Sequence, residues 1–299
     1  MGVPPVAGPE TVRSAAAPRR RRPAWLTGSF VLGLILLFWP LVVSLVAGLV
    51  LDPKGLRIGA APVGSTPSAR LPLGSDGAGR DIAALLAQGT PPTYLIGFVA
   101  GLLGTVFGTT IGLISGYSRG TIDTVLRGIV DVVLGIPALA VAIIVAALLG
   151  SISTEQLALV IAILIWAFPA RQIRSQVLSL REQQYVFISR LSNQGSLSIV
   201  FTELLPNLLP FVMASLVASI SFAILLAVGL QMLSLGSAEP TLGLVLQLAI
   251  SGGALSRGMW WWWLPPAIVL VSIFIGLFLL STSVDRLSNP RLREVADAG

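Results

Sequence analysis

The chain contains neither cysteine nor histidine in its 299 residues. The absence of cysteine excludes disulfides, thiolate chemistry and Cys-ligated metals, and the absence of histidine removes the commonest general base and metal ligand. Ionisable residues make up only 11% of the chain, where a soluble domain has roughly 25%. No GxxxxGK[ST] pattern is present to hold a nucleotide phosphate. We therefore expect a protein that is not an enzyme, binds no metal and carries no cofactor of its own.

Apolar residues are abundant, at 55% of the chain, which predicts an all-α polytopic membrane protein. Residues 23–51 carry no charge over 29 residues, well beyond the roughly 7–15 of a cleavable signal core. We expect a disordered cytoplasmic tail at 1–24 and the first transmembrane helix at 25–51. The remaining regions are expected to be an external segment with a short interfacial helix (52–90), a core of five further transmembrane helices (91–283) and a second cytoplasmic tail (284–299).

Apolar runs within the core predict the five spans at 94–117, 122–150, 156–170, 204–236 and 264–283, with 239–257 as a re-entrant or surface-lying segment. With six spans and an internal amino terminus, 14 of the 19 basic residues fall inside and 5 outside, in agreement with the positive-inside rule. The basic residues flank apolar runs rather than gathering on one soluble face. Nucleic acid is therefore not an expected partner, despite the net charge of +6.

A long polar stretch, residues 171–207, lies between two apolar runs. Its six charged side chains exclude it from hydrocarbon: Arg171, Arg174, Arg181, Glu182, Arg190 and Glu203. Asn193, Gln194 and Gly195 interrupt the stretch, which predicts a short helix, a turn and a second short helix ending at Pro206. The orientation given above makes this loop cytoplasmic. Such a knob can dock into another protein, or its charges can simply keep it out of lipid.

Polar residues inside or beside the other apolar runs are few. In residues 71–81, LPLGSDGAGRD, Asp76 and Asp81 are expected to cap the short interfacial helix. Asp123, Arg127 and Asp131 follow one another at a spacing of four, as a charge-paired stripe on one helix face. Asp131 suits either structural pairing or a role in a pathway or gate, and Gln231 of the fifth span is the second candidate pathway or gate residue.

Glycine recurs at every fourth position in the second span: Gly104, Gly108, Gly112 and Gly116. One face of that helix is therefore bare backbone, which allows close approach of a neighbouring helix.

Four patterns occur in the order found in one family. They are residues 71–81, the passage 116–150, the loop frame of Tyr185-Val186, Arg190 and Leu205-Pro206-Asn207, and the ending 285–293. In these patterns the chain resembles the permease subunits of bacterial ABC importers of the dipeptide, oligopeptide and nickel type, and among them the C-type subunit of the pair. Phe187, Ile188, Ser189 and Asn193 stand where the family has a glutamate, two alanines and a glycine.

The resemblance implies the type I ABC-importer permease fold, with both termini cytoplasmic, in the bacterial cell membrane. Its implied partners are a second homologous permease, two ATPase subunits or domains that use ATP and Mg²⁺, an extracellular solute-binding protein that delivers peptides, and the lipid bilayer. The residues implied in coupling to the ATPases are Tyr185, Arg190, Ser192, Asn193, Gln194, Gly195, Ser196, Ser198, Pro206 and Asn207. The external family motif comprises Gly74, Asp76, Gly79, Arg80 and Asp81.

Other functions stay open at this point. The same machinery could carry a nickel chelate or an oligosaccharide, although a chain without histidine or cysteine is poorly equipped to coordinate a metal. An autonomous secondary transporter or channel would typically show inverted repeats or paired intramembrane ionisable groups, and the sequence shows neither. A membrane scaffold without transport is the third alternative.

Overall fold

The computed structural model describes residues 28–192, 194–237 and 239–288. Within these ranges the chain is built from helices and loops, and its only strand-like pairings are two isolated bridges. The α-helices are α1 (Gly28–Val50), α2 (Ile82–Tyr117), α3 (Thr121–Gly135), α4 (Ala138–Leu149), α5 (Thr154–Ile165), α6 (Ala167–Leu180), α7 (Gln184–Leu191), α8 (Ser196–Ile199), α9 (Leu205–Met232), α10 (Leu242–Ser251) and α11 (Trp260–Ser288). The predicted tail at 1–24 and most of the tail at 284–299 lie outside the described residues.

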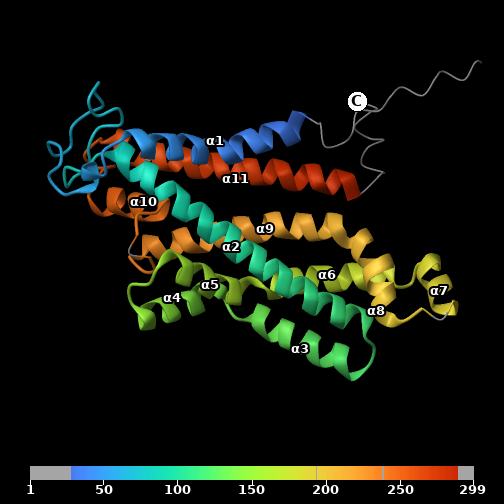
Figure 1. The fold of residues 1–299 in the computed structure, drawn as a ribbon. Coiled ribbons are helices and arrows are strands. Elements are labelled where there is room, and N and C mark those ends of the chain that lie inside the picture. The colour runs from blue at the N-terminus through green and yellow to red at the C-terminus, as the bar shows by residue number, and fades with distance from the viewer. Residues whose placement is uncertain (1–27, 193, 238, 289–299) are drawn as a thin grey trace, which may run out of the picture.

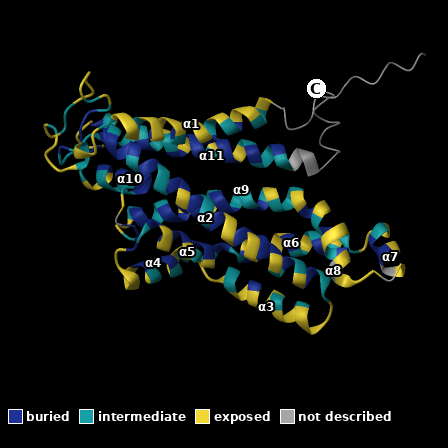
Figure 2. Cartoon of the chain, in the orientation of Figure 1, coloured by how far each residue is buried: buried dark blue, intermediate teal, exposed yellow. Residues whose placement is uncertain are grey.

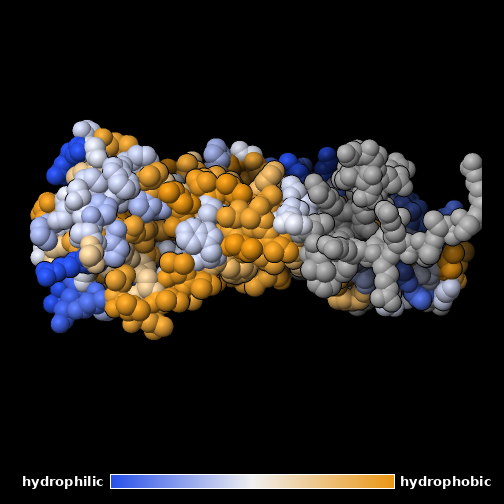
Figure 3. Space-filling view, turned by 90° about the horizontal axis from the view of Figure 1, so that it is seen from above, coloured by the Kyte–Doolittle hydropathy of each residue, from blue (hydrophilic) through white to orange (hydrophobic). Residues whose placement is uncertain are grey.

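The long helices form an elongated bundle in which α2 crosses the other helices obliquely (Figure 1). Residues 52–81 and α10 lie at one end of the bundle, and α7 and α8 lie at the other (Figure 1). Apolar residues cover the middle of the molecule, while hydrophilic residues gather at the end that carries residues 52–81 (Figure 3). This distribution is the one expected of a bundle that lies across a bilayer.

The described residues include four uninterrupted helical segments long and apolar enough to cross a membrane: α1, α2, Val200–Met232 and α11. Two bent pairs, α3 with α4 and α5 with α6, raise the number to six if each pair is one span. The predicted third span, 122–150, is therefore not one straight helix, because its two halves meet at 75°. Pro137 explains the break, since a proline disfavours helical geometry at the residue before it. The predicted fourth span is likewise bent, by 41° between Ile165 and Ala167.

Helix α2 corrects a second expectation. The short interfacial helix predicted within 52–90 is the first part of α2, which continues through Pro91 and Pro92 to Tyr117. Pro91 has no N–H to donate to the carbonyl of Ala87, but the Ser44 hydroxyl of α1 donates to that carbonyl at 2.6 Å. A partner from another helix thus supplies what the proline removes, and α2 reaches 36 residues, about 54 Å at 1.5 Å per residue.

The predicted bare face of α2 is confirmed as a packing surface. A Cβ placed at Gly108 would lie 2.4 Å from the carbonyl oxygen of Trp166, and one at Gly112 would lie 2.7 Å from that of Ala170. Gly116 meets the side chain of Val177 in the same way. Only glycine allows α6 to approach this closely, so α2 and α6 form one rigid pair.

Helix α1 packs against α11 through a similar contact, in which a Cβ at Gly276 would lie 2.7 Å from the backbone nitrogen of Leu37. Tyr94 of α2 donates its hydroxyl to the Leu37 carbonyl, close to Pro40 of α1. The outer face of α1 is exposed and apolar, and so is much of α3 (Figure 2). These faces suit contact with lipid or with another membrane subunit.

Candidate functional site

The predicted pair of short helices is present: α7 and α8 lie at one end of the bundle with a turn between them (Figure 1). Each is held by one buried side chain, Val186 of α7 at 0% exposure and Ile199 of α8 at 1%. Both side chains belong to a core cluster with Ile173, Val177, Leu204 and Leu208. Because Ile173 and Val177 belong to α6, and Leu208 to α9, the short helices are packed onto the long ones rather than suspended from them.

The outer surface of this region includes large apolar side chains. Four large side chains that point away from the core are more than three-fifths exposed: Phe187 (62%), Ile188 (61%), Leu191 (71%) and Phe201 (63%). Three of them occupy α7, a helix outside the long apolar segments. Sequence reasoning did not single out these side chains, although the run Val186 to Ile188 within a polar loop is a visible signal. Exposed apolar residues gathered at one site mark a surface for contact with protein or membrane.

Most of the predicted coupling residues lie in α7, in α8 and in the turn between them. Ser192, Gln194, Gly195, Ser196 and Ser198 are all exposed, and a Cβ at Gly195 would meet nothing within 4 Å. Tyr185 is half-buried against the bundle, and this burial raises the pKa of its hydroxyl. Arg190 belongs to α7, and Asn193 lies outside the described residues. The turn and its flanks are thus free to enter a groove on another protein.

The expected end of the second short helix at Pro206 is wrong. After α8 the chain stays helical through a π-helical turn, Val200–Leu204, and passes directly into α9. Pro206 falls in the first turn of α9, where its missing N–H costs little, and the Asn207 side-chain amide donates to the Glu203 carbonyl at 2.7 Å. As a result, α8 and α9 form one continuous helical path.

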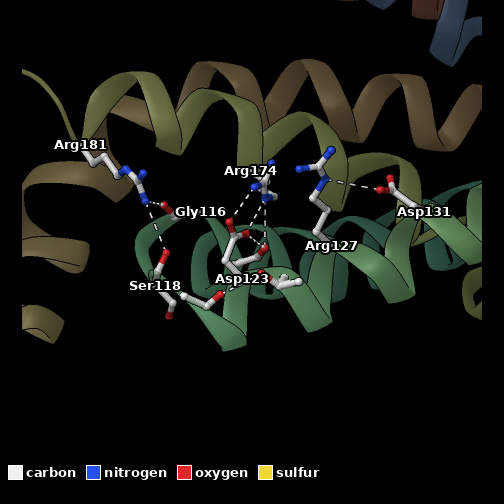
Figure 4. A network of polar contacts seen from close by, with 10 residues as sticks. Gly116, Ser118, Asp123, Arg127, Asp131, Arg174 and Arg181 are labelled. Atoms are coloured by element: carbon white, nitrogen blue, oxygen red, sulfur yellow. Dashed lines mark hydrogen bonds and ion pairs between the residues drawn. The ribbon is translucent and has the colours of Figure 1, made fainter.

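A network of ion pairs connects α6 to α3 and to the end of α2 (Figure 4). Arg174 contacts both carboxylate oxygens of Asp123, at 2.7 and 2.8 Å, and Ser115 donates to the same carboxylate at 2.7 Å. Arg181, the residue after α6, donates to the carbonyls of Gly116 at 2.8 Å and Ser118 at 3.4 Å. Because α7 begins three residues after Arg181, these hydrogen bonds connect the loop between α2 and α3 to the segment that leads into α7.

The predicted stripe on α3 lies in this network. Asp131 is shared by two arginines, with Arg171 at 2.6 Å and Arg127 at 3.5 Å. Its side chain is 47% exposed. The structural pairing expected for Asp131 is therefore present. Its role in a pathway or gate stays a prediction.

Gln231 and Asp131 are not brought together. Asp131 lines a cavity between α2, α3 and α6, whereas Gln231 lines a different cavity at the end of the bundle that carries α10. Gln231 is 2% exposed, and its Nε2 has no hydrogen-bond partner in the described part of the chain. The two candidate pathway residues thus occupy separate places.

The external family motif forms a folded loop. The Asp76 carboxylate, completely buried, accepts from the backbone N–H groups of Ala78 and Arg80 at 2.8 Å and from Arg80 Nε at 2.6 Å. It therefore closes a turn and does not cap the helix as expected. Asp81 does cap α2, because its side chain accepts from the Ala83 N–H at 2.8 Å. Gly74 and Gly79 both have positive φ and approach backbone carbonyls that a Cβ would meet at 2.4 Å.

The described residues contain no group of three or more His, Cys, Asp or Glu side chains that could hold a metal ion. In the external family motif, the carboxylates of Asp76 and Asp81 accept hydrogen bonds from backbone N–H groups, and Asp76 also pairs with Arg80.

Residues 108–294 match the model of the family described as binding-protein-dependent transport system inner membrane component. This chain belongs to that family: it is an inner-membrane permease subunit of a bacterial ABC transporter. Its relatives include the di/tripeptide transport system permease protein DppC of Pseudomonas aeruginosa, 32% identical over 76% of this chain and 75% of that protein. The dipeptide transport system permease protein DppC of Haemophilus influenzae is 31% identical over 74% of this chain and 75% of that protein.

Among solved structures, the chain resembles the inward-facing MetNI methionine ABC transporter with a TM-score of 0.55. The sequence identity is 19%, and the match covers 68% of this chain and 94% of the other. At this identity the likeness concerns the fold, which is that of an ABC importer permease.

Proposed function

We propose that this subunit forms half of a peptide translocation pathway and is driven by ATPases that bind the surface formed by α7, α8 and the turn between them. The exposed apolar side chains of α7, Phe187, Ile188 and Leu191, are the observation that carries the proposal. The same short helices bury Val186 and Ile199 in the core, yet they leave these large apolar side chains exposed. Their exposure on a rigidly mounted pair of helices fits a surface that another protein covers.

The proposed arrangement in the membrane has six spans with both termini in the cytoplasm. The grouping of elements supports this arrangement. One end of the bundle holds the start of α7, the loop between α2 and α3, the start of α1 and the described end of α11 (Figure 1). Residues 52–81 share the other end with α10 and with the turn between α4 and α5. The bent pairs then each count as one crossing, and the charged network of Figure 4 lies on the cytoplasmic side.

In the proposed mechanism, closure of the ATPases on ATP and Mg²⁺ moves α7 and α8 as a unit. Two routes carry that movement into the bundle. Val186 and Ile199 press on α6 and α9 through their shared core, and Arg181 holds the corner at Gly116 and Ser118. A second, homologous permease supplies the other half of the pathway, and the pair alternates between outward and inward access.

Peptides are the proposed solute, delivered by an extracellular binding protein, because the relatives reported above are named for dipeptides and di/tripeptides. A nickel chelate or an oligosaccharide is the alternative solute for the same machinery. Autonomous secondary transport or channel activity is the alternative mechanism. The charged network gives it little support, because the carboxylates of Asp123 and Asp131 are both paired with arginines.

The test is assembly followed by transport. The subunit is expected to purify with two ATPase subunits and a second permease, and the reconstituted complex should take up a dipeptide only with ATP and the binding protein. Uptake by the isolated subunit without ATP would contradict the proposal. Thiol labelling of a cysteine placed at Gln194 is the matching topological test, and reaction with an impermeant reagent outside intact cells would contradict the proposed orientation.

A further inference from the structure

The cavity beside Gln231 is a cleft with both polar and apolar lining residues, at the end of the bundle opposite α7 and α8. It has a volume of 380 Å³ and lies where the ends of α4 and α9 meet the start of α10. It is lined by Ala146, Ala147, Gly150, Ser151, Gln231, Ser234, Leu235, Gly236, Ser237 and Leu244. The rim is exposed at Gly150, Ser151 and Ser234, while Gln231 and Ser237 are buried. The cleft thus has an open mouth and buried polar groups in its interior.

Gln231 is a buried amide without a partner. Its Nε2 finds no hydrogen-bond acceptor among the described residues, although the residue is only 2% exposed. Leaving a buried donor unsatisfied destabilises the folded state, so such a group calls for an explanation. The neighbouring helix makes room for it, because a Cβ at Gly243 of α10 would lie 2.1 Å from Gln231 Oε1. The packing accommodates the amide at a place where an apolar side chain would be less costly.

Ser234 on the rim is the second unusual residue. With φ of 60° it is the only non-glycine residue with positive φ in the described ranges, a conformation that is strained for an L side chain. Its N–H donates to the Gln231 carbonyl at 2.8 Å, and its hydroxyl accepts from Gln247 Nε2 at 2.9 Å. The positive φ and these two hydrogen bonds therefore place the Ser234 hydroxyl at the mouth of the cleft, three residues from Gln231.

The lining mixes polar groups with alanine and leucine side chains and contains no ionisable side chain. Ser237 is within 3.2 Å of the Thr154 hydroxyl and accepts from the Glu239 N–H at 3.1 Å, so the inner wall offers hydroxyl and amide groups beside apolar side chains. Such a wall matches a neutral ligand that both donates and accepts hydrogen bonds. A backbone peptide unit has one carbonyl acceptor and one N–H donor, and the cavity volume falls within the roughly 300–1,000 Å³ of small-molecule sites.

We propose that this cleft is a subsite for one backbone peptide unit of the solute, whose carbonyl accepts a hydrogen bond from Gln231 and whose N–H donates to the Ser234 hydroxyl. The inference rests on the proposed peptide function and on its orientation, which makes this end external. The last torsion of a glutamine side chain is soft, so the Gln231 amide can turn to present Nε2 to a ligand in the cleft that this residue lines. The subsite recognises the peptide unit and not a particular side chain, as a carrier of varied peptides requires.

Protection from thiol labelling tests the subsite in the assembled transporter. The chain has no cysteine, so Ser151→Cys places a single thiol on the rim, and Ala69→Cys places an exposed control thiol in the segment 52–81. A dipeptide at saturating concentration should slow the labelling of Ser151→Cys at least about threefold and leave Ala69→Cys unchanged. Equal labelling with and without dipeptide, while the wild-type complex transports that dipeptide, would overturn the subsite and leave the proposed function intact.

Two variants separate binding from folding. Gln231→Met keeps the volume of the side chain and removes the donor, so protection should weaken about threefold to tenfold, the range for one neutral hydrogen bond. The Tm of the complex should stay the same or rise, because Nε2 has no partner to lose. Ser234→Gly relieves the strained φ and should raise Tm while it also weakens protection. A fall in Tm with protection intact in both variants would assign these residues to structure alone.

The remaining outcomes distinguish the two levels of the proposal. If the wild-type complex transports another solute and neither transports dipeptides nor is protected by them, the peptide function fails and the subsite fails with it. If a water molecule is the only occupant of the cleft, labelling is indifferent to every peptide tested, and the subsite is wrong. The Gln172→Leu variant, which alters an exposed glutamine of α6 that does not line the cleft, is the control and should leave protection unchanged.

Discussion

The two ends of the bundle differ in how their side chains are satisfied. In residues 52–81 the buried carboxylate of Asp76 has three donors from its own loop, and Trp261 Nε1 donates to the Ser75 carbonyl at 3.4 Å. At the other end, α7 presents Phe187, Ile188 and Leu191 to solvent. The first end folds upon itself, whereas the second has a surface that its own chain does not cover. Changes at the first should therefore affect stability, and changes at the second should affect assembly.

The largest expected effect comes from Asp76→Ala. The substitution leaves two backbone N–H groups and the Arg80 guanidinium without their acceptor, and removing one partner of a buried ion pair costs about 3–5 kcal/mol. The Tm of the purified complex measures it. Asp52→Ala is the matched control, because Asp52 is exposed and accepts only the Lys54 N–H at 2.9 Å, a capping contact worth about 1 kcal/mol. Equal shifts in Tm for the two variants would contradict the internal role of Asp76.

The opposite end should show the reverse behaviour. In the double variant Phe187→Ser and Leu191→Ser, two exposed side chains change, so the unfolding free energy should stay within about 0.5 kcal/mol. The affinity for the ATPase subunits should fall at least about thirtyfold, since a central interface residue contributes about 2 kcal/mol or more. Titration of the ATPases against the reconstituted permease pair measures the affinity, and Tm provides the stability control.

Unchanged ATPase affinity in that double variant would remove the main support for the proposed coupling surface. A lower Tm would show instead that the two side chains are packed in the intact protein. Val186→Ala provides the contrast within the same helix, because Val186 is completely buried and its truncation should lower stability.

A pair of glycines compares the two ends with the same chemical change. Gly79 has φ of +73° and its Cβ would lie 2.4 Å from the Ala61 carbonyl oxygen, so Gly79→Ala should destabilise by about 1–3 kcal/mol. Gly195 has open space around its Cβ position, and Gly195→Ala should leave Tm unchanged. Gly195→Trp should likewise preserve Tm, yet reduce peptide-stimulated ATP hydrolysis if the turn enters a groove. Normal coupling in Gly195→Trp would separate the turn from the docking surface.

Much of this comparison could be predicted from local sequence, because charge and glycine act locally. Asn193 to Gly195 marked the turn between α7 and α8. The stretch 171–207 is only partly a loop, because its start belongs to α6 and its end to the apolar segment Val200–Met232, two candidate membrane spans. The spacing of Gly104 to Gly116 announced a close helix contact. What the sequence did not show depends on partners distant in the chain. Ser44 satisfies the Ala87 carbonyl, so Pro91 does not end α2, and no local pattern announces that contact.

The candidate site was predicted less completely than the fold. The exposed residues of the turn were identified from their polarity, but the apolar face of α7 was not, because exposure of an apolar side chain cannot be recognised without knowing which face is buried. The cleft around Gln231 was missed for a related reason. Ser151 and Ser234 are separated by more than eighty residues, and only the meeting of α4, α9 and α10 makes them neighbours.

The smallest effect on stability is expected at Asp131, whose ion pairs are partly exposed to solvent. Its ion pairs with Arg171 and Arg127 are about half exposed, and such pairs contribute about 0–1 kcal/mol. Asp131→Asn should therefore change Tm little, and less than Asp123→Asn, since Asp123 holds a two-pronged contact with Arg174 and is only 23% exposed. Transport decides the remaining question. If Asp131→Asn lowers the rate of ATP-driven uptake more than tenfold with Tm unchanged, the carboxylate acts in a gate, because structural pairing would move both quantities together.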